Sequence, residues 1–384
     1  MNPSQTLSRA RAMQDWLSAH RRAFHMYPEL GFQELRTAER VADALRAMDL
    51  QVQTGVGNTG VVARLGEGPP AVGLRAEMDA LEVREVNNVP YASQRPGLMH
   101  ACGHDGHMAM LLGAAELLRT MKGRPRGEVR FLFQPCEEAW DEEGKGGALR
   151  LVEAGVLEGL AAVIALHVDP GAPAGMVGIR SGPAMAAVDP WTATIRGAGC
   201  HSSAPEQGLS PIYLLTQVVS AIQAVPALRV SPLQPAIVSV ESVHAGGTTG
   251  VIPEQVTLSG NIRSYDEETR RRLWDELERA LGLARALGGD YTLEIRSYYP
   301  ACHNDSEITA LLRRTAEEMI GAERVYLPDL EMAGEDFAYL SREVPGVLFR
   351  LGVSVGDVDR PLHSPLFDLD EAALPLGAAL LAET

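Results

Sequence analysis

Three features of the 384-residue chain predict an α/β fold in which a small α+β domain is inserted into a larger domain. Apolar strands and amphipathic helices alternate over the first part, and this order favours a mixed, mostly parallel sheet with helices on both faces. The middle of the chain has the strand-helix-strand-strand-helix-strand order of a ferredoxin-like domain. The length exceeds what one hydrophobic core usually holds. We therefore expect a main domain formed by 1–185 and 298–384, with an inserted domain at 186–297.

The individual elements are predicted from apolar spacing and from the residues that end each run. Residues 106–121, GHMAMLLGAAELLRTM, have helical apolar spacing, and 128–135, EVRFLFQP, form a buried strand ended by proline. The other main-domain expectations are helices at 8–24, 33–48 and 147–157 and strands at 61–65, 71–79, 161–168 and 346–352. In the inserted domain we expect strands at 191–197, 236–245, 255–265 and 291–297 and helices at 210–225 and 267–286.

Composition disfavours several classes of protein. Lys and Arg total 34 against 50 Asp and Glu, so the net charge is −16 (34 − 50), which disfavours nucleic acid and anionic membranes as partners. The N-terminus, MNPSQTLSRARAMQDWL, lacks the apolar core of a signal peptide, and no apolar run is expected to approach the roughly 18 residues of a spanning helix. Four cysteines are too few for a disulfide framework. We therefore expect a cytoplasmic protein with reduced thiols.

One short stretch, MHACGHDGHMAM, gathers His100, Cys102, His104 and His107. In an extended segment, residues i and i+2 point the same way, so Cys102 and His104 are predicted to reach one metal ion. His107 lies inside the start of a predicted helix and is interpreted as a hydrogen-bonded packing residue. His100 is interpreted as a packing residue or as a support for a ligand.

Further candidates lie just past the ends of apolar strands. Asp79 follows AVGLRAEM, and His167 closes AAVIAL. Glu137 and Glu138 follow VRFLFQPC, and the apolar strand before them disfavours the alternative of a solvated surface pair. Ligands of open α/β sheets bind outside the carboxyl ends of the strands, so these side chains are expected to share one site. His363, in PLHSPLFDLDE, is a weak candidate on its own.

These blocks carry a resemblance to a known family. LRAEMDAL, MHACGHDGHMAM, QPCEEA, ALHV, GEDFAYL and PLHSPLFDLDE are similar to the signature blocks of the M20 metallopeptidases and occur in the family's order. The branch of aminoacylases, hippurate hydrolases and plant auxin-conjugate hydrolases resembles the chain most. The resemblance implies an amidohydrolase with two divalent metal ions per subunit. It assigns as ligands Cys102 (bridging), His104, Glu138, His167 and His363, with Glu137 as general base and Asp79 as supporting acid.

The chemistry of amide hydrolysis agrees with that assignment. A bound metal can lower the pKa of water from 15.7 to roughly 7, and paired metals typically lie ~3.5–4 Å apart. A carboxylate beside the water can take its proton and pass it to the leaving nitrogen. Glu137 and Glu138 can divide these tasks, because one can bind metal while the other acts as the base. A thiolate ligand is soft and favours zinc, although manganese, cobalt and nickel remain compatible.

The inserted domain corresponds to the family's lid, through which many members dimerise, so we expect a homodimer or homotetramer. His201, in GAGCHSSAPEQGLSP, matches a lid histidine that helps to stabilise the oxyanion, and a helix-capping loop histidine is the alternative. Arg263 and His244 are candidates for binding the substrate carboxylate, against the alternative of a solvated strand arginine. Gly250 stands where the family usually has an asparagine, which weakens any transfer of specificity.

Three functions agree with these features. The leading one is hydrolysis of the amide bond of a small-molecule N-acyl amino acid, and the second is a dipeptidase or carboxypeptidase of the same clan. The third is a non-catalytic binding protein with a structural metal. Structural zinc sites are usually closed by four protein ligands and need no adjacent base, so Glu137 beside Glu138 argues against the third.

Overall fold

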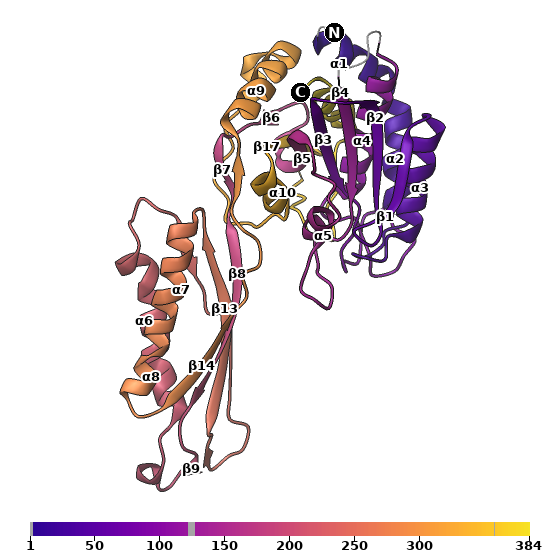
Figure 1. The fold of residues 1–384 in the computed structure, drawn as a ribbon. Coiled ribbons are helices and arrows are strands. Elements are labelled where there is room, and N and C mark those ends of the chain that lie inside the picture. The colour runs from indigo at the N-terminus through magenta and orange to yellow at the C-terminus, as the bar shows by residue number, and fades with distance from the viewer. Residues whose placement is uncertain (1–2, 122–126, 357) are drawn as a thin grey trace. The chain divides into compact units, whose positions relative to one another are not determined.

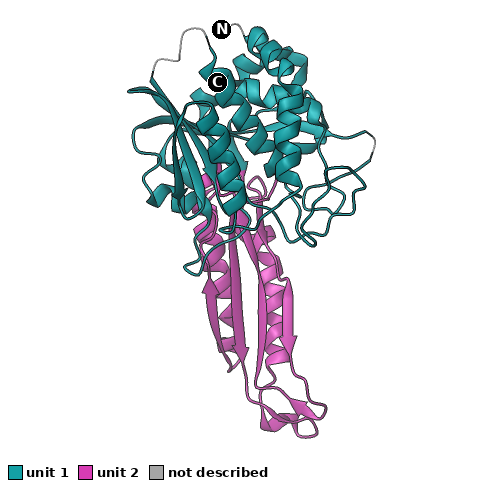
Figure 2. Cartoon of the chain, turned by 90° about the vertical axis from the view of Figure 1, so that its right-hand side faces the viewer, with its two compact units in different colours: residues 1–184, 303–329, 339–384 teal, residues 185–302, 330–338 magenta. Residues whose placement is uncertain are grey.

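The structure is a computed structural model that describes residues 3–121, 127–356 and 358–384. The chain forms two compact units, coloured teal and magenta in Figure 2. Unit 1 contains 1–184, 303–329 and 339–384, and unit 2 contains 185–302 and 330–338. The chain leaves unit 1 in β7 (Gly182–Met185) and returns to it in β15 (Cys302–Asn304).

Unit 1 is built on an eight-stranded sheet with the order β1-β2-β4-β3-β5-β17-β6-β16 (Figure 1). Its strands are β1 Gln51–Val56, β2 Gly60–Glu67, β3 Ala71–Glu77, β4 Gly127–Gln134, β5 Leu160–Pro173, β6 Val177–Gly178, β16 Val325–Tyr326 and β17 Gly346–Ser354. β3 is parallel to β4 and β5, β17 is parallel to β5, and β16 is parallel to β6. The pairs β1–β2, β2–β4 and β6–β17 are antiparallel. The predicted mixed, mostly parallel sheet is therefore confirmed.

The helix α4 forms the centre of the core of unit 1. The helices of this part are α1 Pro3–Ala12, α2 Gln14–His25, α3 Leu35–Ala47, α4 His104–Arg119, α5 Gly147–Glu153, α9 Ser306–Ile320 and α11 Leu374–Glu383, and α10 covers Phe337–Glu343. α4 is buried along nearly its whole length and packs against α2, α11 and β3. Gly113 permits this approach, because an added Cβ would lie 2.6 Å from Leu17 Cδ2 and 2.9 Å from Ala378 Cβ.

Unit 2 contains an antiparallel sheet with the order β10-β13-β8-β14, and β11 also pairs with β13. Its elements are β8 Ala187–Arg196, β9 Cys200–His201, α6 Pro211–Arg229, β10 Ala236–Val238, β11 Ser242–Ala245, β12 Val251–Ile252, β13 Gln255–Ser264, α7 Glu267–Leu281, α8 Leu283–Ala286 and β14 Asp290–Ile295. Alternate residues of β13 are buried, and Figure 1 shows α6 and α7 against the sheet. Val256, Leu258 and Ile262 of β13 share a core with Leu214 and Val218 of α6.

Several elements differ from the expectation. The predicted helix 267–286 is two helices, α7 and α8, which are separated at Gly282. The predicted helix 8–24 is two helices, α1 and α2, which are separated at Met13. The strand β1, QVQTGV, was not predicted, because its residues are mostly polar and exposed and give no apolar alternation. The predicted strand 236–245 is two strands, β10 and β11, each paired with a different part of β13.

The helix α6 overturns one expectation about membranes. By length and composition alone it is apolar enough to cross one, although no such run was anticipated. Its face with Leu214, Val218 and Ile222 is buried in the core of unit 2, while Ile212 and Leu228 are exposed. A helix that packs on a sheet can have the same length and apolar composition, so this single helix is weak evidence for a membrane span.

Candidate metal centre

The predicted site residues of unit 1 lie beyond β3 and β4, in β5 and at the start of α4. Asp79 follows β3, and Glu137 and Glu138 follow β4. His167 lies inside β5, which continues beyond the predicted end of that strand, and His104 is the first residue of α4. Because β4, β3 and β5 are contiguous parallel strands, their carboxyl ends meet at one edge of the sheet.

The segment between Cys102 and His104 is a turn rather than the extended segment that was assumed. Gly103 has a φ of 85°, a left-handed conformation that glycine adopts without steric cost. An added Cβ at this position would lie 2.5 Å from Val168 Cγ2. The expectation that Cys102 and His104 reach one point is met, but the glycine turn produces it.

Four groups of potential ligand atoms form among the described residues of unit 1, and two of them share Cys102. The first of these two contains Cys102, His104 and His167, and the second contains Cys102, Glu138 and His363. Within each group, the ligand atoms lie within 4.8 Å of one another. Cys102 Sγ lies 3.5 Å from His167 Nε2, and His363 Nε2 lies 3.1 Å from Glu138 Oε1. The structure therefore brings these five side chains together, with the thiol in both groups.

Hydrogen bonds at one ring nitrogen orient two of the histidines. His104 Nδ1 donates to the backbone carbonyl of Asp79 at 2.9 Å, and His167 Nδ1 donates to the carbonyl of Val168 at 2.9 Å. In the neutral form of each ring the lone pair is then on Nε2, the arrangement that metal-binding histidines adopt. His104 Nε2 is buried and has no hydrogen-bond partner among the residues that the structure describes. The donor set therefore fits a divalent metal ion.

The electrostatics of the site also favour a cation. Burial and the charges of Glu138 and Glu137 raise the pKa of the Cys102 thiol well above its usual range. Burial opposes a charge on His104, but its hydrogen bond to Asp79 and the nearby carboxylates raise its pKa to about 10. The site thus holds an excess of negative charge, which a divalent metal would offset while stabilising the thiolate.

Asp79 belongs to neither ligand group but supports both. Its Oδ2 accepts a hydrogen bond from the backbone N–H of Glu138 at 2.8 Å, and its carbonyl receives His104 Nδ1. Burial alone would raise the pKa of Asp79, but the hydrogen bonds from His104 and from backbone N–H groups lower it below its usual range. Asp79 is therefore a buried, ionised acid behind the potential ligands.

The other two histidines of the stretch have different surroundings. His107 Nδ1 donates to Glu77 at 2.8 Å, and its Nε2 accepts from the backbone N–H of Val168 at 3.0 Å. Both ring nitrogens are thereby used, as a packing histidine requires, although Glu77, His104 and His107 also form a compact group. Burial lowers the pKa of His100 to about 3, so its ring is neutral.

Glu34, a buried acid directly before α3, was not among the predicted residues. Its Oε1 accepts a hydrogen bond from the backbone N–H of Cys136 at 2.8 Å, and its Oε2 accepts from the Thr59 hydroxyl. Cys136 precedes Glu137 and has a φ of 46°, which is rare for a residue other than glycine. No local pattern marks Glu34, because its contact joins residues 102 positions apart.

The remaining predicted site residues lie in unit 2. His201 is exposed on β9, where its Nδ1 accepts from the backbone N–H of Ser203 at 3.1 Å, so it caps a turn rather than a helix. His244 is exposed on β11. Arg263 is half-buried on β13 and donates to the carbonyl oxygen of Met332, so it is not simply solvated. These three residues belong to a different unit from the two ligand groups.

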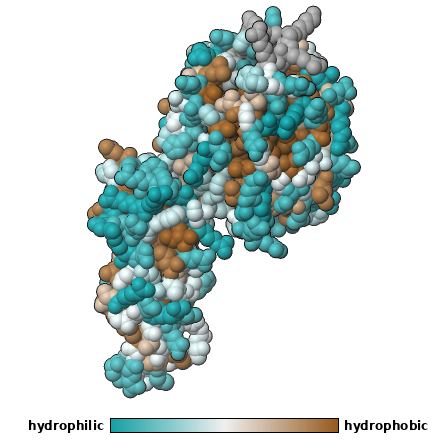
Figure 3. Space-filling view, viewed as in Figure 1, coloured by the Kyte–Doolittle hydropathy of each residue, from teal (hydrophilic) through white to brown (hydrophobic). Residues whose placement is uncertain are grey.

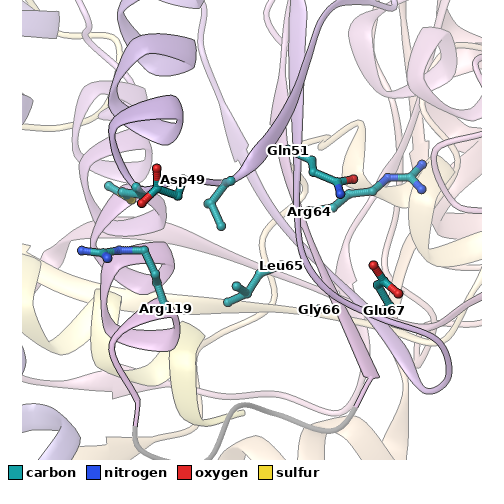
Figure 4. Close-up of a pocket in the computed structure, with 9 residues that line it drawn as sticks. Asp49, Gln51, Arg64, Leu65, Gly66, Glu67 and Arg119 are labelled. Carbon is teal, nitrogen blue, oxygen red and sulfur yellow. The ribbon is translucent and has the colours of Figure 1, made fainter.

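A surface pocket of about 440 Å³ also lies in unit 1 (Figure 4). It is lined in part by Arg119, the last residue of α4, whereas His104 is the first, so about 20 Å of helix separates them. Asp49, Arg64 and Glu67 complete a lining of mixed charge. The pocket contains none of the predicted site residues and is not part of the metal centre.

Comparison with known proteins gives the family. Residues 73–384 match peptidase family M20/M25/M40. The chain belongs to this family. The resemblance of the sequence blocks to the M20 metallopeptidases is thereby confirmed, and the protein is an enzyme that acts on amide bonds. Glu34 lies before the matched region.

Three similar proteins cover nearly the whole chain. N-acetyl-L-cysteine deacetylase from Bacillus subtilis is 38% identical over 371 residues, which cover 95% of this chain and 86% of that protein. Thermostable carboxypeptidase 1 from Saccharolobus solfataricus is 37% identical over 384 residues, which cover 97% of this chain and 96% of that protein. The solved structure of a dinuclear metal-binding M20 peptidase from Bacillus subtilis has a TM-score of 0.84 and 32% identity, with 97% of each chain covered.

Proposed function

We propose that this M20 enzyme hydrolyses the amide bond of N-acyl amino acids, giving a carboxylate and a free amino acid, with two divalent metal ions per subunit. The observation that carries the proposal is the pair of ligand groups that share Cys102. In this proposal the Cys102 thiolate would help to hold both metal ions. His104 and His167 complete one metal site, and Glu138 and His363 complete the other.

The chain's own residues supply the proton transfers and the orientation. When bound, the two metals would polarise the substrate carbonyl and lower the pKa of the attacking water. Glu137, whose carboxylate lies within 4.8 Å of ligand atoms of His104 and Glu138, accepts the water's proton and passes it to the leaving nitrogen. Asp79 fixes the backbone of Glu138 and the ring of His104, so both ligands keep their orientation.

Zinc is the metal that the donor set supports best. A thiolate is a soft ligand, and imidazole nitrogens also suit zinc. Manganese, cobalt and nickel accept the same nitrogen and oxygen donors, so the test includes all four. Apoprotein prepared with a chelator should regain activity on addition of one or more of these ions, and elemental analysis should find two per subunit.

Two relatives support different substrates. The deacetylase is named for an N-acyl amino acid, and the carboxypeptidase is named for peptides. We therefore propose N-acyl amino acid hydrolysis first, with dipeptide or carboxyl-terminal peptide hydrolysis as the alternative. Metal-loaded protein should be assayed on acetyl, benzoyl and long-chain acyl amino acids and on dipeptides, with products identified by mass. Faster hydrolysis of dipeptides would favour the alternative, and one metal per subunit with no turnover would favour a binding protein.

Unit 2 is proposed to act as the lid and as the dimerisation domain. In this role His201 stabilises the oxyanion, and Arg263 and His244 bind the substrate carboxylate. Light scattering on the purified protein will distinguish a homodimer or homotetramer from a monomer. The acidic net charge supports a protein that binds neither nucleic acid nor anionic membranes. The four cysteines, too few for a disulfide framework, support a cytoplasmic location, which cell fractionation tests.

A further inference from the structure

The backbone directly before the Glu137–Glu138 pair adopts an unusual conformation. Cys136 is fully buried and has a φ of 46°, in the left-handed region that residues other than glycine rarely adopt. Such a conformation persists only where the surrounding structure holds it. Because Cys136 directly precedes the pair, the direction of its backbone decides where both carboxylates point.

Contacts with Glu34, Gly147 and Gly31 help to hold this turn. The backbone N–H of Cys136 donates to Glu34 Oε1 at 2.8 Å, and its carbonyl accepts from the backbone N–H of Gly147 at 2.7 Å. The side chain packs against Gly31, where an added Cβ would lie 2.5 Å from Cys136 Sγ. Among these three contacts, only the one with Glu34 uses a polar side chain. A substitution at Glu34 therefore alters the side-chain hydrogen bond to the Cys136 N–H without replacing any residue of the turn itself.

Glu34 is itself held in place by the first turn of α3 and by Thr59. It directly precedes α3, and its carbonyl accepts the backbone N–H of Ala38 at 2.9 Å in the first turn of that helix. Its side chain is fully buried, and its second oxygen accepts the Thr59 hydroxyl. Burial and the charge of Asp79 raise the pKa of Glu34 to about 7, so the negatively charged form of this side chain is disfavoured here. The hydrogen bonds that its side chain accepts from the Cys136 N–H and the Thr59 hydroxyl account for an acid at this buried position.

We infer that Glu34 is a positioning residue: it holds the Cys136 turn and thereby aims Glu138 at the metal and Glu137 at the attacking water. The inference rests on the proposed dinuclear hydrolase and deepens it. Glu34 acts through the backbone, since it is not a member of either ligand group. It also assigns a role to a residue outside the region that matches the family.

The test first compares three single-residue variants of the full-length protein. Glu34→Asp keeps the charge but is one methylene shorter, so it is not long enough to reach both Cys136 and Thr59. Glu34→Gln keeps the length and an oxygen that accepts the Cys136 N–H. Thr59→Val is the matched control, because it removes the second hydrogen bond of Glu34 and leaves the one to the turn. Affinity for Zn²⁺ is measured by competition with a chelator, and kcat and KM are measured at saturating Zn²⁺.

Glu34→Asp should lower Zn²⁺ affinity or kcat by about 10–100-fold, the range for residues that orient metal ligands, with KM little changed. Glu34→Gln and Thr59→Val should stay close to wild type. Wild-type values for Glu34→Asp, or equal losses for Glu34→Gln, would overturn the inference. Adding Cys136→Gly to Glu34→Asp should recover affinity, because glycine adopts the left-handed turn freely, and failure to recover it would count against the role. The affinity measurement needs no substrate, so it stands even if wild type hydrolyses no acyl amino acid.

Discussion

His104 Nδ1 lies 2.9 Å from the backbone carbonyl oxygen of Asp79 and 3.3 Å from its carboxylate Oδ1. This double contact sets the tautomer of the imidazole and leaves Nε2 for the ligand group with Cys102 and His167. The same carboxylate holds the backbone N–H of Glu138 at 2.8 Å. One buried acid therefore orients a candidate ligand in each of the two groups.

We expect Asp79→Asn to weaken metal binding without unfolding the protein. The substitution keeps the shape but removes the negative charge that supports His104, so metal affinity should fall by about 10–100-fold. Chelator competition measures the change. Asp49→Asn is the control, because Asp49 is exposed in the separate pocket of unit 1 and loses the same charge. Equal losses in both variants would show a long-range charge effect instead of a specific contact.

Cys102→Ser should lower metal content and turnover together. Serine replaces a soft thiolate with a harder and weaker ligand, and both ligand groups contain Cys102. Elemental analysis and an amidase assay on the same preparation measure the two quantities. Cys200→Ser is the control, since Cys200 lies on β9 in unit 2. Full metal content and normal turnover in Cys102→Ser would remove the thiol from the proposed site.

The features predicted correctly are those that local sequence determines. The apolar period of 106–121 indicated α4. Cys102 and His104 do reach one point, but through the turn at Gly103 and not through the extended segment that their spacing suggested. The two-helix form of 8–24 and the polar strand β1 were missed, because tertiary packing decides both. The hydrogen bond from the Cys136 backbone N–H to Glu34 could not be predicted from local sequence. In the sequence alone, an acid before a helix resembles an ordinary helix start, and its partner is 102 positions away.

A buried ion cluster behind the site should contribute strongly to stability. Arg21 is fully buried and contacts Asp105 at 2.7 Å and Asp368 at 2.8 Å. Arg21→Met would remove the guanidinium from both carboxylates and leave His25 beside Asp105, so unfolding free energy should fall by about 3–5 kcal/mol. The neighbouring Arg22 pairs with Glu371 but is half-exposed, so Arg22→Met should cost only about 0–1 kcal/mol. Urea denaturation compares the two variants, and similar losses would contradict the buried-charge argument.

The same cluster predicts a loss of stability in acid. Burial alone would raise the pKa of Asp105, but the charges of Arg21 and His25 hold it well below its usual range. The folded pKa therefore lies below the unfolded value of about 3.9, so this stabilisation is present above that pH and is lost as the pH falls below it. Unfolding free energy of wild type should decrease below about pH 4. The decrease should be smaller in Arg21→Met, and an equal decrease would assign the acid sensitivity to other groups.

The separate roles proposed for Glu137, as general base, and Glu138, as metal ligand, give the most direct test of the proposed mechanism. Glu137→Gln keeps the shape of the side chain but cannot accept a proton, so kcat should fall by about 10²–10⁴-fold, the usual contribution of general acid–base catalysis. Metal content and substrate binding should persist, because the two ligand groups that share Cys102 do not include Glu137.

Glu138→Gln should fail in a different way, because the amide is a weaker metal ligand than the carboxylate that lies 3.1 Å from His363 Nε2. Its metal affinity should fall, and added metal should restore part of the activity. Each variant is an isosteric control for the other, since both lose one negative charge on neighbouring residues. If Glu137→Gln loses metal while Glu138→Gln retains it, the two roles are reversed. If both variants hydrolyse acyl amino acids at the wild-type rate, neither carboxylate takes part, and the base and the second metal site must be sought elsewhere in the chain.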